Sequence, residues 1–513
     1  MKLQRASGLL LHPTCLPGRY GIGALGAQAR DFAGLLAASG QTVWQMLPLG
    51  PTGYGDSPYQ GLSTFAGNPL LIDLDDLVAD GWLLASDLAA APVFSEDAVD
   101  YGAVIDFKRP LLERACERFE QQAADGPRQA LQEFCRRQAF WLDDFALFTA
   151  LKAEHDGAAW SAWEPAVARR EAGALETWRR RCVRRIARCK FQQFVFFQQW
   201  RRLQDVCAGL GVRLMGDLPL FVAHDSADVW AHPELFRLTA DGRPAFQAGV
   251  PPDYFSATGQ CWGNPLYRWD MMARTGFAWW IERFRHTLEW FDLVRLDHFR
   301  GFEACWEIPG DDQTAENGRW IQVPGPALFE ALRAALPALP CVAENLGVIT
   351  PEVEQLRREL GFPGMAVLQF AFGADPPVPE FLPHNYSHKL VVYTGTHDND
   401  TTVGWWHAGP EDGSTRSAAA IDAERAYCRR YLGSDGREIH WAFIRAALAS
   451  VAALAVVPLQ DVLGLGSEAR MNLPARPADN WRWRFRRGAF SDELRARLRE
   501  LSEVYGRFTP PAG

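Results

Sequence analysis

The sequence predicts a (β/α)₈ barrel, an α/β fold in which eight parallel strands alternate with helices around a closed sheet. First, short apolar runs recur along the chain with helix-like stretches between them, as at residues 276–289, 327–336 and 351–360. Second, eight such runs can be counted, and strands that alternate with helices form parallel sheets. Third, the later runs end in acidic or amide side chains, and this fold carries its sites at the carboxyl ends of the strands. We therefore expect one catalytic barrel domain over residues 1–513.

The eight expected strands lie on either side of a long helical region. Thr42–Leu49 has the composition of a buried strand, and Leu70–Leu74 follows it after a loop dense in turn residues. Because a long loop after a strand is more often functional than idle, residues 50–69 are a candidate part of a site. The other six strands are expected within residues 212–221, 293–299, 341–347, 365–370, 391–400 and 454–462.

Two insertions are expected to enlarge the barrel. Residues 75–204 have apolar side chains at three- and four-residue steps, which predicts a mainly helical insertion. Its Arg-rich stretch at 169–188 also contains Glu171 and Glu176, so it is typical of a solvated helix face rather than an RNA-binding surface. Residues 225–290 are expected to form a loop-rich insertion, in which the aromatic and Pro-rich segment of about 250–262 is a candidate lid.

Composition narrows the class of partner. A formal net charge of −9 argues against general binding to nucleic acid or to anionic membranes, since both require a positive field. The ten cysteines contain no CxxC pair, which favours a reducing compartment, and the N-terminus lacks a signal-peptide core. The longest apolar run, residues 446–459, is too short to span a bilayer. We expect a cytoplasmic protein.

Two local motifs are interpreted as structural. Gly21, Gly23 and Gly26 form a GxGxxG pattern, but no strand precedes it and no acidic residue follows about 20 positions later. It is therefore expected to be a loop that caps a helix over residues 27–39. The alternating Trp and Arg residues at 480–484 could stack on bases, but we favour a packing segment. The high aromatic content, with 20 Trp, is also compatible with stacking on sugar rings.

Four acidic residues follow predicted strands, at Asp217, Asp297, Glu344 and Asp398. Carboxylates that meet in one cleft repel each other, so one pKa rises while a nearby cation lowers another. Arg295 lies two residues before Asp297 and so points the same way on a strand. Cleavage of a glycosidic bond requires such a divergent pair, a protonated acid and an ionised carboxylate. Glu344, after an apolar run, is the better acid, and Asp297 is the better nucleophile.

Two other interpretations use the same residues. His224–Asp225 and His397–Asp398, with Asp400, resemble the His–Asp pairs of metal-dependent phosphohydrolases. Those enzymes are helical, whereas His397 follows a strand-like run, so this hypothesis ranks lower. A non-catalytic carbohydrate-binding protein would explain the aromatic residues but not the repeated acids at strand ends.

Long motifs in a fixed order identify a family resemblance. They include GDSPYQ at 55–60, GDLPLFVAHDSADVW at 216–230, GVPPDYFSATGQCWGNPLY at 249–267, RLDHFRGF, AENLG, THDNDT, MNLP and NWRWR. With these motifs the chain resembles, nearly end to end, the 4-α-glucanotransferases of the amylomaltase (disproportionating enzyme) family, in the α-amylase clan. The resemblance implies transfer of α-1,4-glucan segments by a retaining double displacement.

The resemblance also implies roles for individual residues. Asp297 is the expected nucleophile, Glu344 the general acid/base and Asp398 the carboxylate that stabilises the transition state. The residues expected to bind substrate are Tyr59, Ser57, Asp217, Trp262, Arg295, His298, His397 and Asn472. Tyr54 and Tyr101 are expected at a secondary glucan site away from the catalytic centre.

The same resemblance sets expectations for ligands and assembly. The expected partners are malto-oligosaccharides and α-1,4-glucans, with glucose as an acceptor, and neither nucleic acid nor membrane. No metal and no organic cofactor is expected, and the protein is expected to be a monomer or a small homo-oligomer.

Overall fold

The structure is a computed structural model that describes residues 4–252, 256, 258–373, 378–410, 417–474, 476 and 478–508. Its centre is an eight-stranded parallel sheet, ordered β10-β11-β12-β1-β2-β3-β6-β9. The strands are β1 (Ala6–Leu10), β2 (Val43–Gln45), β3 (Arg213–Leu218), β6 (Leu293–Leu296), β9 (Cys341–Ala343), β10 (Gly364–Val367), β11 (Leu390–Tyr393) and β12 (Leu454–Pro458).

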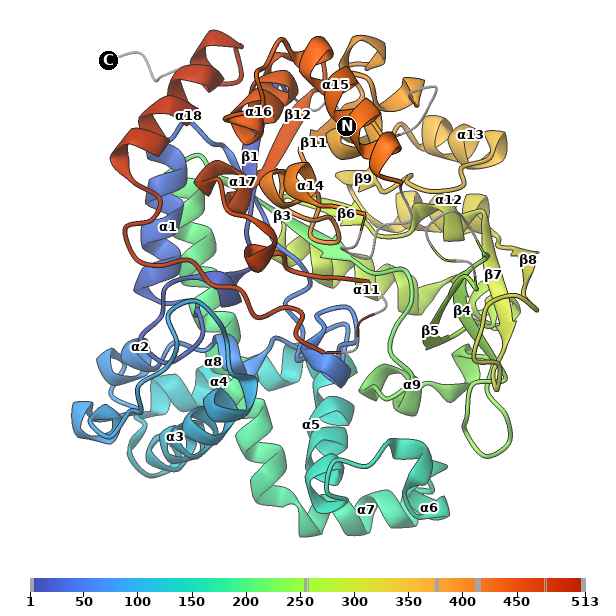
Figure 1. The fold of residues 1–513 in the computed structure, drawn as a ribbon. Helices are drawn as coiled ribbons and strands as arrows, with labels where there is room; N and C mark the ends of the chain where they lie inside the picture. The colour runs from blue at the N-terminus through green and yellow to red at the C-terminus, as the bar shows by residue number, and fades with distance from the viewer. Residues whose placement is uncertain are drawn as a thin grey trace.

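The two ends of this strand order meet, so the sheet is nearly closed. The Ala343 N–H on β9 donates to the Pro363 carbonyl, 2.9 Å away, directly before β10. The side chain of Asn345 then accepts from the Met365 N–H at 2.8 Å. The predicted (β/α)₈ barrel is therefore confirmed, with helices around the sheet (Figure 1).

One of the eight predicted strands was wrong. Leu70–Leu74 is not a strand, because Asn68 caps a 3₁₀ turn at Pro69–Leu71 and Asp73 caps helix α2 (Leu74–Ala79). Both caps satisfy backbone N–H groups at the start of a helical turn, and this local bonding outweighs the apolar composition. The missing strand is β1, a fully buried run between β12 and β2 that the prediction did not include.

Helices between β2 and β3 form the large lobe along the bottom of Figure 1. The longest, α8, has one apolar face buried along its length, including Phe191, Phe194 and Leu203. This lobe occupies the region for which a helical insertion was expected. It contains α2, α3 (Tyr101–Gln122), α4 (Asp125–Arg137), α5 (Ala139–Glu154), α6 (Pro165–Ala168), α7 (Ala172–Arg181) and α8 (Val183–Gly209).

A second, four-stranded sheet lies beside the barrel, at the right of Figure 1. Its antiparallel order is β5-β4-β7-β8, with β4 (Phe246–Val250), β5 (Gln260–Pro265), β7 (Ala304–Pro309) and β8 (Arg319–Gln322). The segment 225–290 thus supplies two strands as well as α9 (Ala227–Ala231), α10 (Trp269–Arg274) and α11 (Ala278–Trp290). Residues 253–255 and 257 of the candidate lid lie outside the described residues.

The remaining helices pack around the barrel. Helix α1 begins after Gly26, which confirms the loop and cap interpretation of the early glycine pattern. A Cβ on Gly23 would lie 1.9 Å from the Pro13 carbonyl oxygen, so this glycine permits close backbone approach. The helices are α1 (Ala27–Ala38), α12 (Gly325–Ala335), α13 (Pro351–Leu360), α14 (Thr402–His407), α15 (Ala418–Leu432), α16 (Ile439–Ala449), α17 (Leu459–Leu463) and α18 (Asp492–Val504).

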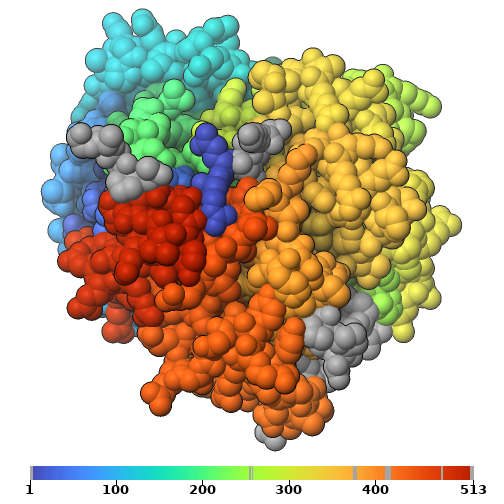
Figure 2. Space-filling view, turned by 90° about the horizontal axis from the view of Figure 1, so that it is seen from above, coloured from blue at the N-terminus to red at the C-terminus, as the bar shows by residue number. Residues whose placement is uncertain are grey.

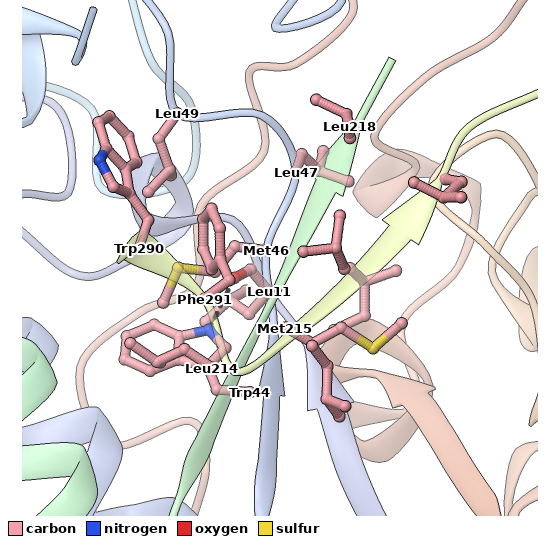
Figure 3. Close-up of a cluster of buried hydrophobic side chains, with 14 of the residues drawn as sticks. Leu11, Trp44, Met46, Leu47, Leu49, Leu214, Met215, Leu218, Trp290 and Phe291 are labelled. Carbon is pink, nitrogen blue, oxygen red and sulfur yellow. Dashed lines mark hydrogen bonds between the residues drawn. The ribbon is translucent and has the colours of Figure 1, made fainter. Parts of the chain in front are cut away.

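Buried apolar side chains between the sheet and its outer helices also pack around the ends of the strands. Trp44 and Leu214 from neighbouring strands pack with Phe291, while Leu49 and Trp290 lie side by side above them (Figure 3). Gly216 on β3 faces the Phe291 ring, where an added Cβ would come within 2.2 Å of it. This dense packing fixes the strand ends that carry the polar residues.

The two ends of the described chain meet. Arg5 donates to the Tyr505 carbonyl at 2.9 Å, and Arg507 donates to the Ala6 carbonyl at 2.8 Å. Figure 2 shows the first described residues, in dark blue, against the red C-terminal helix. Trp481, Trp483 and Arg484 are buried, which confirms the packing interpretation of the NWRWR segment. No helix in the described ranges is long and apolar enough to cross a bilayer.

Candidate active site

An arginine at the end of β6 joins two of the strand-end carboxylates. Parallel pairing of β3 with β6 sets Asp217 directly opposite Arg295. The Arg295 Nη1 donates to both oxygens of Asp217, at 2.9 and 2.8 Å, and to Asp297 Oδ1 at 2.9 Å. Residues 295 and 297 thus share a face, as the sequence spacing predicted.

Burial makes this ion cluster strongly interdependent. Arg295 and Asp217 are each 5% exposed. Burial raises the pKa of Asp217, and the positive charge of Arg295 opposes that rise. Burial lowers the pKa of Arg295, but the charges of Asp217 and Asp297 more than offset it and leave the pKa well above its usual value. Arg295 therefore stays charged beside Asp297.

Glu344 follows β9 and is held by two backbone donors. The His298 N–H donates to Oε2 at 2.7 Å, and the Leu346 N–H donates to Oε1 at 2.9 Å. Burial and the negative charge of Asp297 raise the Glu344 pKa to about 7, against the opposing effect of Arg295. A carboxyl group with a pKa near neutrality can both donate and accept a proton at that pH.

The third carboxylate, Asp398, lies in the loop after β11. Its Oδ1 accepts from Asn472 Nδ2 at 2.6 Å, and its Oδ2 lies 3.4 Å from His397 Nε2. The His397 ring stacks on Tyr59 with centroids 5.1 Å apart, and the Tyr59 hydroxyl donates to Asp217 at 2.9 Å. Asp398 is thus joined to the Arg295 cluster by a chain of direct contacts.

These contacts bring the three expected catalytic carboxylates to one mouth of the barrel. Glu344 is connected to the cluster through His298, the residue that follows Asp297. The side chains of Asp297 and Asp398 remain 27% and 47% exposed, so a ligand can reach them. Glu344, whose pKa is raised to about 7, shares this cleft with them.

The remaining expected substrate-binding residues lie around this cluster. The Trp262 ring on β5 meets the His298 ring edge-on, with centroids 4.9 Å apart. Gln60 donates to the Trp262 carbonyl at 3.2 Å, which connects this strand to the loop that carries Tyr59. Ser57 accepts from the Tyr59 N–H at 3.3 Å and so shapes the same loop.

The two tyrosines expected at a secondary glucan site differ in accessibility. Tyr54 is 77% exposed and offers a free ring face. Tyr101 is 7% exposed, and its hydroxyl donates to the Trp481 carbonyl at 2.9 Å. Of the two, Tyr54 is the one whose ring is available to a ligand.

The residues behind the metal hypothesis have other partners. His224 Nε2 is hydrogen-bonded to the Gly242 carbonyl at 2.7 Å, and Asp225 accepts from Lys152 at 2.6 Å. Asp400 accepts from Ser467 at 2.7 Å. Within the described part of the chain, no cluster of three His, Cys, Asp or Glu side chains has a geometry suited to a metal ion.

Sequence reasoning missed several residues that build the site. Arg470 donates to the carbonyls of Asp398 and Asn472, at 2.7 and 2.8 Å. Asp461 is buried after β12 and accepts from Thr402 N–H and Oγ1, at 2.6 and 2.8 Å. An acid after an apolar run was a signal for Asp461, whereas nothing local in the sequence indicates what Arg470 contacts.

Comparisons with known proteins agree with this geometry. The family described as 4-alpha-glucanotransferase matches residues 11–490. A 4-alpha-glucanotransferase from Thermus thermophilus is 51% identical over 99% of this chain and 100% of its own length. The chloroplastic/amyloplastic enzyme of Solanum tuberosum is 42% identical over 98% of this chain and 87% of its own.

A solved structure extends the agreement to three dimensions. The amylomaltase from Streptococcus agalactiae in complex with acarbose superposes with a TM-score of 0.93 at 37% identity, covering 99% of this chain and 100% of its own. The predicted family resemblance is confirmed. The chain belongs to the 4-alpha-glucanotransferase family of enzymes.

Proposed function

We propose that the protein transfers segments of α-1,4-glucan from one malto-oligosaccharide chain to the 4-hydroxyl of glucose or of another glucan. The observation that carries the proposal is the joined set of three carboxylates at one barrel mouth, one of them with a pKa of about 7. Family membership supports the same reaction. We propose that it proceeds in the cytoplasm, by a monomer or a small homo-oligomer.

In the first step the Asp297 carboxylate attacks the anomeric carbon of the donor sugar. Glu344 gives its proton to the leaving glycosidic oxygen, and the shorter chain departs with a free 4-hydroxyl. The bond from the anomeric carbon to that oxygen breaks as the bond to Asp297 forms. Arg295, which donates to Asp297 at 2.9 Å, keeps the attacking carboxylate oriented.

In the second step an acceptor 4-hydroxyl attacks the same carbon and displaces Asp297. Glu344, now ionised, takes the proton of that hydroxyl, so the enzyme returns to its starting state. Two inversions give net retention. We expect Asp398 and His397 to bind hydroxyl groups of the sugar at the cleaved bond, and Trp262 to serve the acceptor side. The Asp217 side chain is 0% exposed, so it acts by holding Arg295 and Tyr59 rather than by touching the sugar.

Transfer rather than hydrolysis requires that water be kept from the glycosyl ester. The aromatic segment of about 250–262 is our candidate for the cover, because Trp262 at its end already contacts His298. Shortening this segment should raise the share of hydrolysis. An unchanged ratio of transfer to hydrolysis would remove the segment from that role.

The test is to incubate the protein with maltotriose and analyse the products. A ladder of longer glucans together with glucose supports transfer. Glucose and maltose alone would mean hydrolysis, and unchanged maltotriose would contradict both.

A further inference from the structure

A cavity lies outside the catalytic mouth. It has a volume of about 630 Å³ and is formed by α4 and the start of α5, by α8, and by α11. None of the strand-end carboxylates lines it. It therefore lies between the helical lobe and the barrel wall.

The cavity walls combine aromatic rings with planar polar groups. Phe140, 45% exposed, and the partly buried Phe197 supply ring surface, above the buried Trp200 and Trp290. Such rings can pack against the apolar face of a sugar. The volume is in the range of pockets that hold small ligands.

The charges on the walls nearly cancel. Arg137, Arg201 and Arg285 contribute three positive charges, and Glu282 and Glu289 contribute two negative ones. His286 adds none at neutral pH, because burial lowers its pKa to about 4. Both glutamates would repel an anion such as a nucleotide. A neutral polyhydroxyl chain can instead accept hydrogen bonds from the arginines and donate to the glutamates.

Glu289 provides an acceptor that the protein itself leaves open. Glu282 is paired with Arg285, but no hydrogen bond or ion pair to a described residue engages the Glu289 carboxylate. The Glu289 main chain is fixed instead, since Gln204 donates to its carbonyl at 2.9 Å. Sugar hydroxyls are donors that such a carboxylate can bind.

The cavity shares a wall with the catalytic side. His286 and Trp290 also line a smaller cavity, of about 70 Å³, and Tyr59 and Asp217 are among the other residues that line it. His286 Nε2 is hydrogen-bonded at 2.7 Å to the carbonyl of Phe65, in the loop that follows Tyr59. A ligand in the larger cavity therefore touches residues that also support the catalytic loop.

We propose that this cavity binds a segment of α-1,4-glucan at a non-catalytic site, separate from both the catalytic cleft and Tyr54. The inference rests on the proposed function, because the class of ligand is that of the substrate. Its role is to hold a long chain while another part of that chain reacts.

Titration calorimetry of maltoheptaose into the full-length Asp297→Asn protein tests this site. We expect two classes of binding site that are both retained when Tyr54→Ala is added, one in the catalytic cleft and one in the cavity. Adding Phe140→Ala, or separately Glu289→Ala, should weaken one class at least about tenfold and leave the other unchanged. Val183→Ala is the matched control, since Val183 is 61% exposed on α8 and does not line the cavity.

Several results would overturn the inference. One class of site in the parent protein, or isotherms that neither cavity variant changes, would do so. Loss of the second class on Tyr54→Ala would also overturn it, because the second site would then be at Tyr54. Displacement of maltoheptaose by ADP would overturn it too, because the cavity would then bind a nucleotide. Equal melting temperatures for all variants exclude unfolding as the cause. A protein that forms the maltotriose ladder but has one class of site fails this inference alone.

Discussion

At the scale of single residues, the site depends on how differently three carboxyl groups are surrounded. Asp297 faces a charged guanidinium, whereas the half-buried Glu344 accepts from the backbone N–H groups of His298 and Leu346. We therefore expect the same functional group to serve as a nucleophile at Asp297 and as an acid at Glu344. Substitution of Asp297 and substitution of Glu344 should therefore affect different steps of the reaction.

Asp297→Asn should abolish turnover of maltotriose. Loss of a residue that forms the covalent intermediate costs roughly 10³-fold or more in kcat. The measurement is glucose release under substrate saturation. Near-normal activity would remove Asp297 from the nucleophile role, whatever its contacts with Arg295.

Glu344→Gln should slow cleavage of maltotriose by roughly 10²–10⁴-fold, because the leaving oxygen then receives no proton. A maltosyl fluoride donor needs no such proton, so formation of the glycosyl ester from it should be largely preserved. In the wild-type enzyme, kcat/KM should fall as pH rises through about 7, where Glu344 loses its proton. A cleavage rate that is flat from pH 6 to 8 would argue against this acid.

The raised pKa of Glu344 also predicts a change in stability. Its folded-state pKa of about 7 exceeds the ordinary value of 4.5, so the folded protein binds the proton more tightly than the unfolded chain. Wild-type stability should therefore fall as pH rises from about 4.5 through about 7. Glu344→Gln should remove this loss and raise the melting temperature more at pH 8 than at pH 5. Equal shifts at both values would contradict the assignment.

At the scale of elements, the parallel register explains why sequence reasoning could place the acids. Residues that end neighbouring parallel strands meet at one edge, so Asp217, Asp297 and Glu344 could be grouped without coordinates. The strand at Leu70–Leu74 was misplaced because caps from Asn68 and Asp73 decide that segment, and caps compete with apolar pattern.

Other contacts in the structure could not be predicted from local sequence patterns. Arg470 contacts Asp398, 72 residues earlier, and Arg507 contacts Ala6, 501 residues earlier. Such contacts depend on the tertiary fold, which brings distant segments together, and no periodicity or motif in the sequence predicts them. The buried position of Tyr101 was hidden for the same reason, since its partner is Trp481.

The loop that carries Arg470 should position Asp398 without touching the sugar. Arg470→Ala frees the carbonyls of both Asp398 and Asn472, and a displacement of about 1 Å at a catalytic group can cost roughly 10²-fold. We expect kcat to fall by about 10- to 100-fold with little change in KM, and Arg470→Lys to recover part of the loss. A rise in KM at unchanged kcat would instead indicate direct binding.

At the scale of the whole molecule, the beginning and the end of the described chain meet beside β1 and β12. Arg507 is 2% exposed and lies against the end of α16 and the start of β1, where it donates to the carbonyls of Leu448 at 2.7 Å and Ala6 at 2.8 Å. Its guanidinium also donates to the carbonyls of Ala447, Ser450, Ala452 and Ala453. Arg507, together with Arg5, thus ties the turn between α16 and β12 to both ends of the described chain.

Arg507→Ala should therefore destabilise the entire barrel. The change removes hydrogen bonds to six buried carbonyls, of which those of Leu448, Ser450 and Ala452 keep a donor in Arg5. At about 0.5–1.5 kcal/mol for each lost hydrogen bond, we expect a loss of about 3 kcal/mol in the free energy of unfolding. Arg507→Lys keeps a positive charge but not the planar set of donors, and should recover only part of the loss. Arg180→Ala, which breaks an ion pair exposed at 79% and 52%, is the control and should change stability by less than about 1 kcal/mol. Denaturant unfolding measures the stability of all three variants. Equal losses for Arg507→Ala and Arg180→Ala would show that the contacts of Arg507 do not stabilise the barrel.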